Sequence, residues 1–450
     1  MHANSDTGLT HRQTVTLLVI SALLVAVAPL AKTVIPLGLV KLALFGVAAA
    51  VMGFLAFCYP KQGLYFTIFY IYAGLSFYAP YPVAAPLVVL IAASVLLRIL
   101  RGDEEPINNW FFSASICVLT VIVIQSMVYA WYPAQALLAL TVYAKVLVVV
   151  LLCLQLIRTP RDLERLAMVM LAGVVATVLL GVVNIKMGWE KDATAISAIL
   201  DVNRFAGTHV NPNKGALYMG AGIPLAVYAI RRSRLLIYRF MFGMVAVGLV
   251  VAIVMSFSRQ AFFPLGFVLF AVFFKEARNK WGYLTGIVVV LVTLWVIPPY
   301  YWYRLRSVSD MMQGMSEDWS FFLRLQAHKT AWHLFVDAPF TGVGLNNFQL
   351  RSATELIARI PTHNAYLDIL VWLGIFGFAA YLAVLLSGVR GFIVAMKARW
   401  DPELDWLPHL CYYFLISFLT VLTGAVFQSV SLYYLVWIPV AAGVIAQRLA

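Results

Sequence analysis

Apolar runs follow one another along almost the whole chain, with short polar segments between them. Runs of about 20 residues are long enough to cross a bilayer as helices. Backbone groups in lipid must be hydrogen-bonded within the protein, which a helix achieves by itself. Short alternating strands, the pattern of an outer-membrane barrel, are not evident. The pattern therefore predicts an all-α polytopic membrane protein.

The positions of these runs predict the spans. We expect them at 15–31, 36–58, 63–80, 82–100, 111–131, 135–157, 164–187, 213–230, 239–257, 260–275, 282–299, 364–388, 406–427 and 431–448. Several are short or closely spaced, so the fold class is best stated as about 12 (12–14) transmembrane helices with one large periplasmic loop.

The same pattern divides the chain into four parts. Residues 1–199 are N-terminal transmembrane helices, 200–299 are transmembrane helices with outer-side arginine segments, 300–362 form the large outer loop, and 363–450 are C-terminal transmembrane helices. The first apolar run has no clear signal-peptide cleavage site, so we interpret it as a retained helix.

Composition and charge agree with a membrane protein. The chain is 63% hydrophobic and 11% charged, whereas soluble domains carry about 25% charged residues. The net charge of +13 raises the question of nucleic acid. Most of this excess lies in short loops between spans, which is the usual signature of membrane orientation. We therefore expect contact with membrane lipids and no nucleic acid.

The basic loops fix the orientation. They all fall on one face of the alternating arrangement and contain Arg98, Arg101, Arg158, Arg161, Arg165, Arg231, Arg232, Arg234, Arg239, Lys275, Arg278, Lys280, Arg390, Lys397 and Arg399. By the positive-inside rule this face is cytoplasmic, as are both termini. Residues 188–212 and 300–362 then lie on the outer face, where we expect the chemistry because function concentrates in loops.

His363 is the candidate catalytic base. It lies in the segment "PTHNAYLDILVWLGIFG", at the start of an apolar run, and Thr362 is the expected N-cap. A neutral imidazole can take a proton from a sugar hydroxyl near neutral pH, and a nearby helix N-terminus disfavours the cation. The alternative is an interfacial histidine that only hydrogen-bonds. For Asp368, one turn inside the helix, we expect a structural salt bridge.

Cationic side chains on the outer side are candidates for binding a diphosphate. They are Arg259 in "SFSR", Arg204 in "RFAGTHVNPN", Arg324 in the large loop, and Lys214. Guanidinium groups match phosphate oxygens in pairs. Contacts with lipid headgroups or loop salt bridges are the alternative for each of them.

A metal site is not expected. Divalent cations prefer carboxylate ligands, and no Asp-x-Asp pair occurs in the outer loops, while Asp103, Glu104 and Glu105 fall on the cytoplasmic side. We therefore predict chemistry without a metal or other cofactor, in which arginines neutralise a leaving diphosphate.

The segments "PFTGVGLNNF" and "THNAYLDILVWLGIFG" resemble the O-antigen ligase and polymerase superfamily. The resemblance covers about residues 200–390 and rests on Arg324, on Gly342, Gly344 and Phe348, on His363, Asn364, Tyr366 and Leu367, and on Gly374 and Gly377. The "SFSR" and "RFAGTHVNPN" stretches are also similar. Asn347 and His328, within the same region, are candidate supporting residues together with Asn364 and Tyr366.

The resemblance implies a glycosyltransferase of the bacterial inner membrane whose active site faces the periplasm. The donor would be a glycan on undecaprenyl diphosphate, and the acceptor the lipid A core oligosaccharide. A histidine like His363 would deprotonate the acceptor hydroxyl, arginines like Arg259 and Arg324 would hold the diphosphate, and the anomeric configuration would invert.

Three other functions stay open. A polymerase would use a second lipid-linked repeat unit as acceptor and tends to show Arg-x10-Gly patterns in two outer loops. Arg204 to Gly215 fits that spacing, but Phe335 stands where the large loop would need the second glycine. A protein O-oligosaccharyltransferase would modify serine or threonine. A lipid-linked sugar transporter or flippase would need charged residues near the bilayer midplane, for which Lys41, Lys145 and Asp368 are the candidates within spans.

Overall fold

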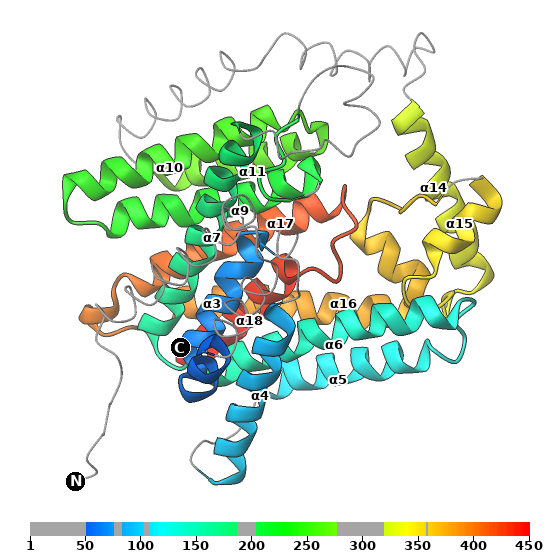
Figure 1. The fold of residues 1–450 in the computed structure, drawn as a ribbon, viewed down its shortest axis with the longest axis horizontal. Helices are drawn as coiled ribbons and strands as arrows, with labels where there is room; N and C mark the ends of the chain where they lie inside the picture. Colours follow the sequence, from blue (N-terminus) through cyan, green and yellow to red (C-terminus); the bar gives the residue numbers. More distant parts are fainter. Residues whose placement is uncertain are drawn as a thin grey trace, which may run out of the picture.

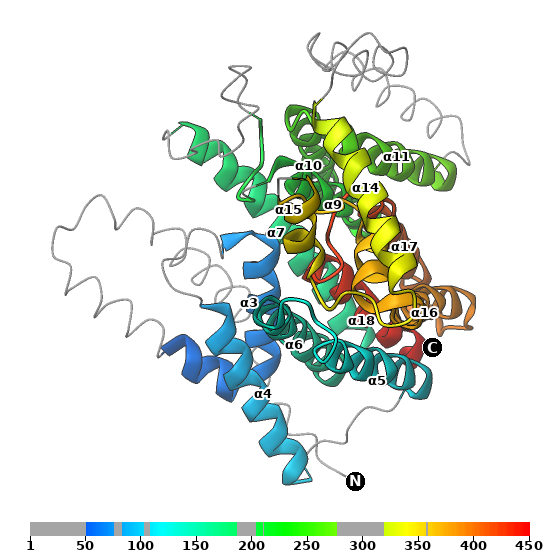
Figure 2. The same ribbon diagram turned by 90° about the vertical axis from the view of Figure 1, so that its right-hand side faces the viewer.

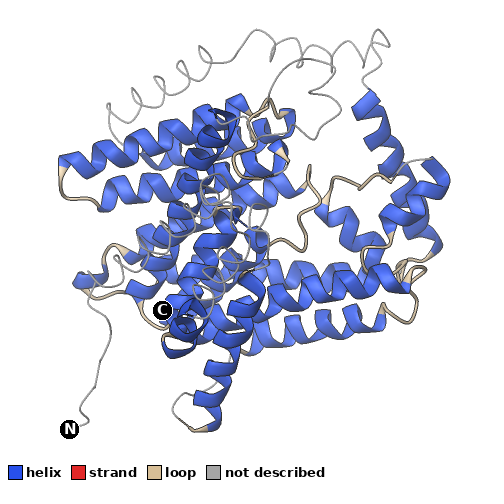
Figure 3. Ribbon diagram, viewed as in Figure 1, coloured by secondary structure: helices blue, strands red, loops and turns tan. Residues whose placement is uncertain are grey.

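The computed structural model describes residues 51–75, 83–102, 109–186, 204–209, 211–276, 319–356 and 359–450, and every regular element in these ranges is helical (Figure 3). The α-helices are α3 (Pro60–Tyr72), α4 (Ala84–Leu100), α5 (Trp110–Gln125), α6 (Pro133–Leu156), α7 (Pro160–Lys186), α9 (Pro212–Arg232), α10 (Leu236–Met255), α11 (Phe262–Glu276), α14 (Trp319–Asp337), α15 (Phe348–Leu356), α16 (Ala365–Lys397), α17 (Leu407–Ala425) and α18 (Tyr434–Leu449). Short 3-10 helices occur at η2 (Arg259–Ala261) and η3 (Pro402–Leu404).

The polytopic prediction is confirmed, while the number of spans stays a prediction. Among the described residues, five segments are long and apolar enough to cross a membrane: Pro133–Leu156, Pro160–Asn184, Leu236–Met255, Ala365–Lys397 and Pro402–Ala425. Shorter apolar helices occur at Ala84–Leu100, Trp110–Gln125 and Tyr434–Leu449. The expected spans 15–31 and 282–299, and most of 36–58, lie outside the described residues.

The bundle has two chemically different ends. At one, which we call the basic end, Arg232 at the close of α9 donates to Glu164 near the start of α7 over 2.8 Å. Arg448 at the close of α18 donates to the carbonyl of Leu154 over 2.8 Å, and Lys275 lies 4.6 Å from the ring centre of Tyr412.

The opposite end, which we call the site end, carries the start of α9. Lys214 and Arg232 are 18 residues apart in this helix, which corresponds to about 27 Å at 1.5 Å per residue. Basic helix ends and the candidate site therefore lie on opposite sides of the bundle. This separation is what the positive-inside interpretation requires.

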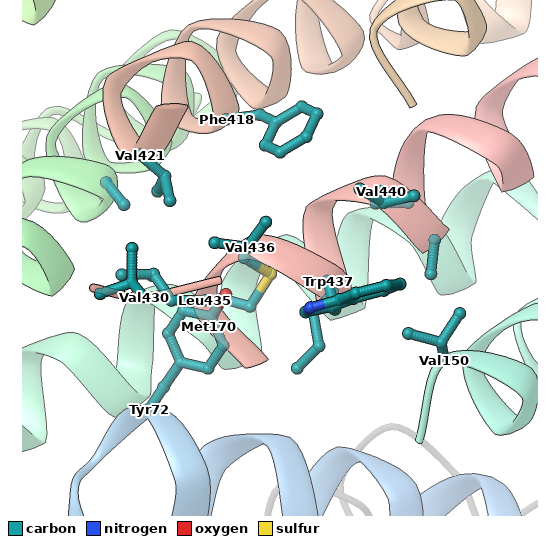
Figure 4. Close-up of a cluster of buried hydrophobic side chains, with 14 of the residues drawn as sticks. Tyr72, Val150, Met170, Phe418, Val421, Val430, Leu435, Val436, Trp437 and Val440 are labelled. Carbon is teal, nitrogen blue, oxygen red and sulfur yellow. The ribbon is translucent and has the colours of Figure 1, made fainter. Parts of the chain in front are cut away.

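The core is built from apolar side chains of helices far apart in the sequence. Tyr72, Met170, Phe418, Val436 and Trp437 are all buried in it, and they come from α3, α7, α17 and α18 (Figure 4). The backbones of α16 and α18 approach closely where the two helices cross. A Cβ built on Gly391 would stand only 2.0 Å from the carbonyl oxygen of Gly443. Small residues allow such close helix packing in membranes.

Helix α16 is broken at Gly374, which has φ 68° inside the element. The loop that follows α14 fills the break. The amides of Val343 and Gly344 donate to the carbonyls of Val371 and Trp372 over 2.9 and 3.0 Å, and the amide of Ile375 donates to Pro339 over 2.8 Å. The backbone groups freed by the break are thus satisfied by protein, as a membrane-embedded segment requires.

The 300–362 region, expected only as a large loop, contains α14 and α15. Both lie together at the right-hand end of the bundle in Figure 1, and α14 packs against α15 and α16. Figure 2 views the molecule from this end, with α14 and α15 in front. These two helices place polar residues of the 300–362 region beside the start of α16.

Candidate functional site

His363 lies in the turn that leads into α16, and its backbone is in the left-handed region at φ 56°. The residue that caps the helix is Asn364, whose side-chain oxygen accepts from the amides of Tyr366 and Leu367, each over 3.0 Å. The prediction that Thr362 is the N-cap is therefore wrong. Thr362 is buried and uses its hydroxyl inside the turn, where it accepts from the amide of Asn364 over 3.0 Å.

The imidazole of His363 is buried within electrostatic reach of Arg324, Lys214 and His328. Burial, together with the charges of Arg324 and Lys214 and the ring of His328, lowers the pKa of His363 from its ordinary value of 6.5 to about 4. The ring is therefore neutral near pH 7, as a base must be. The sequence predicted a neutral ring because of a helix N-terminus, whereas burial and the neighbouring cations account for it.

These contacts bring together side chains from three regions of the chain. Arg324 and His328 stand one turn apart on α14, which places them on one face of that helix. The Nε2 atom of His328 lies 2.7 Å from the carbonyl oxygen of Thr362. Since Thr362 directly precedes His363, α14 is joined by a hydrogen bond to the turn that carries the candidate base.

Lys214 enters the same group from the first turn of α9. Asn211 caps this helix by accepting from the amides of Asn213 and Lys214 over 2.9 and 3.4 Å. The ammonium group of Lys214 donates to the hydroxyl of Tyr433 and lies 4.4 Å from the centre of its ring. The cap and the tyrosine therefore hold a positive charge near His363.

His209 lies in the loop just before α9. Its ring stacks on Tyr218 with centroids 4.2 Å apart. Burial, together with the charge of Lys214, lowers the pKa of His209 to about 4. Lys214 thus acts electrostatically on both His209 and His363.

Arg204 has a buried side chain whose guanidinium joins two helix ends. Its Nε donates to the carbonyl of Ser256 after α10, and its Nη2 donates to Asn213 in α9, each over 3.0 Å. The amide of Phe205 also donates to Met255 over 3.0 Å. The two arginine-containing segments that the sequence singled out are therefore packed together, with Arg204 as the link.

Arg259 lies three residues after Ser256 and is the first residue of η2. Ser258 caps this turn by accepting from the amide of Ala261 over 3.3 Å. The neighbouring Gln260 accepts a hydrogen bond from Gln428 in the loop between α17 and α18. Arg259 thus stands at the site end, between the α10 terminus and that loop.

The supporting residues predicted from the sequence each make a contact that fixes a helix or loop. Asn347 is fully buried, and its Oδ1 accepts from the amide of Tyr132 over 2.6 Å. Its Nδ2 donates to the carbonyl of Leu345 over 3.0 Å. The hydroxyl of Tyr366 donates to the carbonyl of Leu422 over 2.9 Å.

Asp368 is buried in the first turn of α16, and its partner is a hydroxyl group. The side chain of Thr362 donates to Oδ1 of Asp368 over 2.6 Å. Within the described ranges, the three recorded ion pairs all involve Asp162 or Glu164. The expected salt bridge of Asp368 is therefore replaced by a buried hydrogen bond.

Sequence reasoning missed the loop between α17 and α18, residues 426–433. It contributes Tyr433 to Lys214 and Gln428 to Gln260, and Ser429 acts on the carboxyl of Asp368. The available signal was the run of polar side chains in "FQSVSLYY" between two apolar spans at the expected outer face. No familiar motif marks it, so these positions drew no attention.

The fold and this cluster define a class: a helical, multi-pass membrane protein with a histidine and several cations gathered at one end. Residues 244–382 match the protein family described as O-antigen ligase. The chain therefore carries an O-antigen ligase domain over these residues, and Arg259, Arg324 and His363 fall within it. A comparison with curated proteins gave no match.

Proposed function

We propose that this protein transfers an O-antigen glycan from undecaprenyl diphosphate to the lipid A core oligosaccharide at the periplasmic face of the inner membrane. The observation that supports it best is the gathering of His363, Arg324, Lys214 and His328 at one end of the bundle. The family match over 244–382 implies a lipid-linked glycan as substrate. A base beside phosphate-binding cations is what such a transfer needs.

In the proposed reaction, neutral His363 takes the proton of the acceptor hydroxyl. The resulting oxygen attacks the anomeric carbon of the donor, and the bond from that carbon to the diphosphate oxygen breaks. Undecaprenyl diphosphate leaves with the bonding electron pair, and the proton on His363 passes to solvent. Attack opposite the leaving group inverts the anomeric configuration.

The cations serve the leaving group in this proposal. Arg324 and Lys214 both act on His363, so a diphosphate between them and the imidazole would lie next to the base. Its negative charge would oppose the cations and bring the pKa of His363 back toward its ordinary value, making the ring a stronger base once the donor is bound. Arg259 and Arg204 stand at the same end of the bundle and are proposed to extend this binding surface.

The test is reconstitution of the purified protein with undecaprenyl diphosphate glycan and lipid A core, in the presence of EDTA. A new glycosidic bond to the core supports the proposal, and His363→Ala is expected to abolish it. His333→Ala is the matched control, because His333 is exposed on α14, and it should transfer at the wild-type rate.

Other products would replace the proposal with another function. Longer glycan on the lipid carrier would indicate a polymerase, and glycan on an added serine-rich or threonine-rich protein would indicate a protein O-oligosaccharyltransferase. Movement of the donor across the bilayer without a new glycosidic bond would indicate a flippase. Transfer that stops on removal of divalent cations would contradict the predicted metal independence.

A further inference from the structure

Thr362 is held from two sides, and it is the residue directly before His363. Its hydroxyl donates to Oδ1 of Asp368 over 2.6 Å, and its carbonyl oxygen lies 2.7 Å from Nε2 of His328. Thr362 and Asp368 are both almost completely buried. The position of His363 in the turn is therefore set by a hydrogen bond on each side of its preceding residue.

The side-chain oxygen of Asp368 is the nearer of two possible acceptors for the single proton of the Thr362 hydroxyl. The carbonyl oxygen of Asn364 lies 2.9 Å from the hydroxyl, against 2.6 Å for Oδ1 of Asp368. Both distances lie within the usual range for a hydroxyl donor, and the shorter one marks the closer hydrogen bond. Asp368 therefore determines which way the hydroxyl points, and leaves its oxygen to accept from the amide of Asn364.

The left-handed backbone of His363 makes this support necessary. A φ of 56° is unfavourable for a residue with a side chain, and such a conformation persists only where the surroundings enforce it. The hydrogen bonds of Thr362 to Asp368, which is buried, and to His328, which is partly buried, are the contacts that flank it.

The second oxygen of Asp368 faces the loop that sequence reasoning missed. Oδ2 of Asp368 and the hydroxyl of Ser429 are both buried and have no hydrogen-bond partner within the described part of the chain, and Ser429 acts on this carboxyl. The charge of Lys214 acts on it as well. A small rotation of the Ser429 hydroxyl would join the 426–433 loop to the turn of His363.

We propose that Asp368 is the positioning residue for His363. It acts through its hydrogen bond with the hydroxyl of Thr362, and Ser429 links it to the 426–433 loop. Asp368 is 1% exposed, so it does not itself touch substrate. The inference rests on the proposed function, since His363 is the base that Asp368 positions.

The experiment measures kcat and KM for donor and acceptor with four variants of the full-length protein. Asp368→Ala and Thr362→Val each remove the hydrogen bond, and Asp368→Asn and Thr362→Ser each keep it. Loss of positioning lowers kcat, and small misplacements of a reacting group cost up to about 100-fold. We expect kcat to fall about 10- to 100-fold in the first pair, with both KM values within about threefold of wild type.

The conservative variants and a double variant distinguish a positioning role from a general loss of structure. Asp368→Asn and Thr362→Ser are expected to keep kcat within about threefold of wild type. The double variant Asp368→Ala with Thr362→Val should be no slower than the slower single variant, since both changes remove one bond. Elution as a single folded species in detergent is the control for each variant.

Three results would overturn the inference. They are a wild-type kcat in Asp368→Ala, multiplicative losses in the double variant, and equal losses in Asp368→Asn and Asp368→Ala. An inactive wild-type protein would instead contradict the proposed function itself. If Asp368→Ala does not fold, Thr362→Val against Thr362→Ser decides the question by the same comparison.

Discussion

The imidazole of His328 lies 2.7 Å, measured from Nε2, from the carbonyl oxygen of Thr362. This bond joins α14 to the turn that carries His363, and its two residues are 34 positions apart in the chain. Arg324 stands one turn before His328 on the same helix face. The hydrogen bond of His328 therefore fixes the position of Arg324 relative to His363. The predictions below concern this arrangement and the elements that support it.

The first prediction concerns the pH dependence of transfer. The pKa of His363 in the free protein is lowered to about 4, so the imidazole is neutral above that pH and protonated below it. We expect kcat/KM for the donor to be level from neutral pH down to about 5 and to fall as the pH drops through about 4. This ratio reports the free enzyme.

Removing a neighbouring charge should shift the acid limb of the pH profile, which is the fall of kcat/KM at low pH. Lys214 and Arg324 both lower the pKa of His363, so Lys214→Ala and Arg324→Ala should move the limb toward pH 6.5. Lys329→Ala is the control, because Lys329 is exposed on α14. A limb that stays in place in both variants would show that His363 does not control the rate.

The second prediction concerns Arg259. If its positive charge serves the donor diphosphate, Arg259→Ala should raise KM for the donor by about tenfold or more, since a hydrogen bond to a charged group contributes about 1.5–3 kcal/mol. Arg259→Lys should raise it much less. Arg390→Ala, at an exposed arginine near the C-terminal part of α16, should leave KM unchanged. Equal effects of alanine and lysine would indicate that the paired geometry of the guanidinium matters more than its charge.

The third prediction concerns the cap of α16. Asn364 accepts from the amides of Tyr366 and Leu367, and removing such a cap costs about 1 kcal/mol. Asn364→Ala should therefore lower the thermal unfolding temperature in detergent, whereas Asn364→Asp should keep it near wild type. Thr362→Ser should also be near wild type, and a larger loss there than in Asn364→Ala would contradict the cap assignment.

The fourth prediction concerns the break in α16. A Cβ on Gly342 would stand 2.4 Å from the carbonyl oxygen of Trp372, and one on Gly374 would stand 2.5 Å from that of Phe340. Both glycines also have positive φ. We expect Gly342→Ala and Gly374→Ala to reduce the yield of folded protein sharply, because the backbone of one segment has to move.

Gly243 provides the control for these two glycines. It lies within α10, and a Cβ there meets nothing within 4 Å. Gly243→Ala should leave the yield unchanged or raise it, since alanine favours a helix by about 0.5–1 kcal/mol over glycine. Normal yields in all three variants would show that the close approach at the break is not tight.

The hydrophobic pattern predicted the helices well because each apolar run is a local property of the chain. The expected 135–157 corresponds to α6 at Pro133–Leu156, and 406–427 to α17 at Leu407–Ala425. The run at 63–80 predicted less well: α3 ends at Tyr72, with Gly74 at φ 63° just beyond it. A turn of this kind does not alter the hydrophobic pattern.

Contacts between distant residues were the part that the sequence could not reveal. Thr362 and Asn364 are both good N-cap residues, and the choice between them depends on Asp368, which accepts a hydrogen bond from the Thr362 hydroxyl. The bonds of Arg204 to Ser256 and Asn213 likewise depend on how two helix ends pack. Residue type and the expected side of the membrane suggested that Arg324, Lys214 and His363 belong to one site, but they could not show that the three interact.

The loop that packs into the break at Gly374 also constrains the stretch of chain from Val343 to Trp372. The bonds of Val343 to Val371 and of Gly344 to Trp372 tie the two ends of that chain to each other, so α15 and the turn of His363 form a ring closed by backbone. A ring fastened at its base can vary in its outer part without displacing the point where it is fastened. Insertions beside the exposed Arg359 should therefore be tolerated far better than any change of length between Gly342 and Gly344.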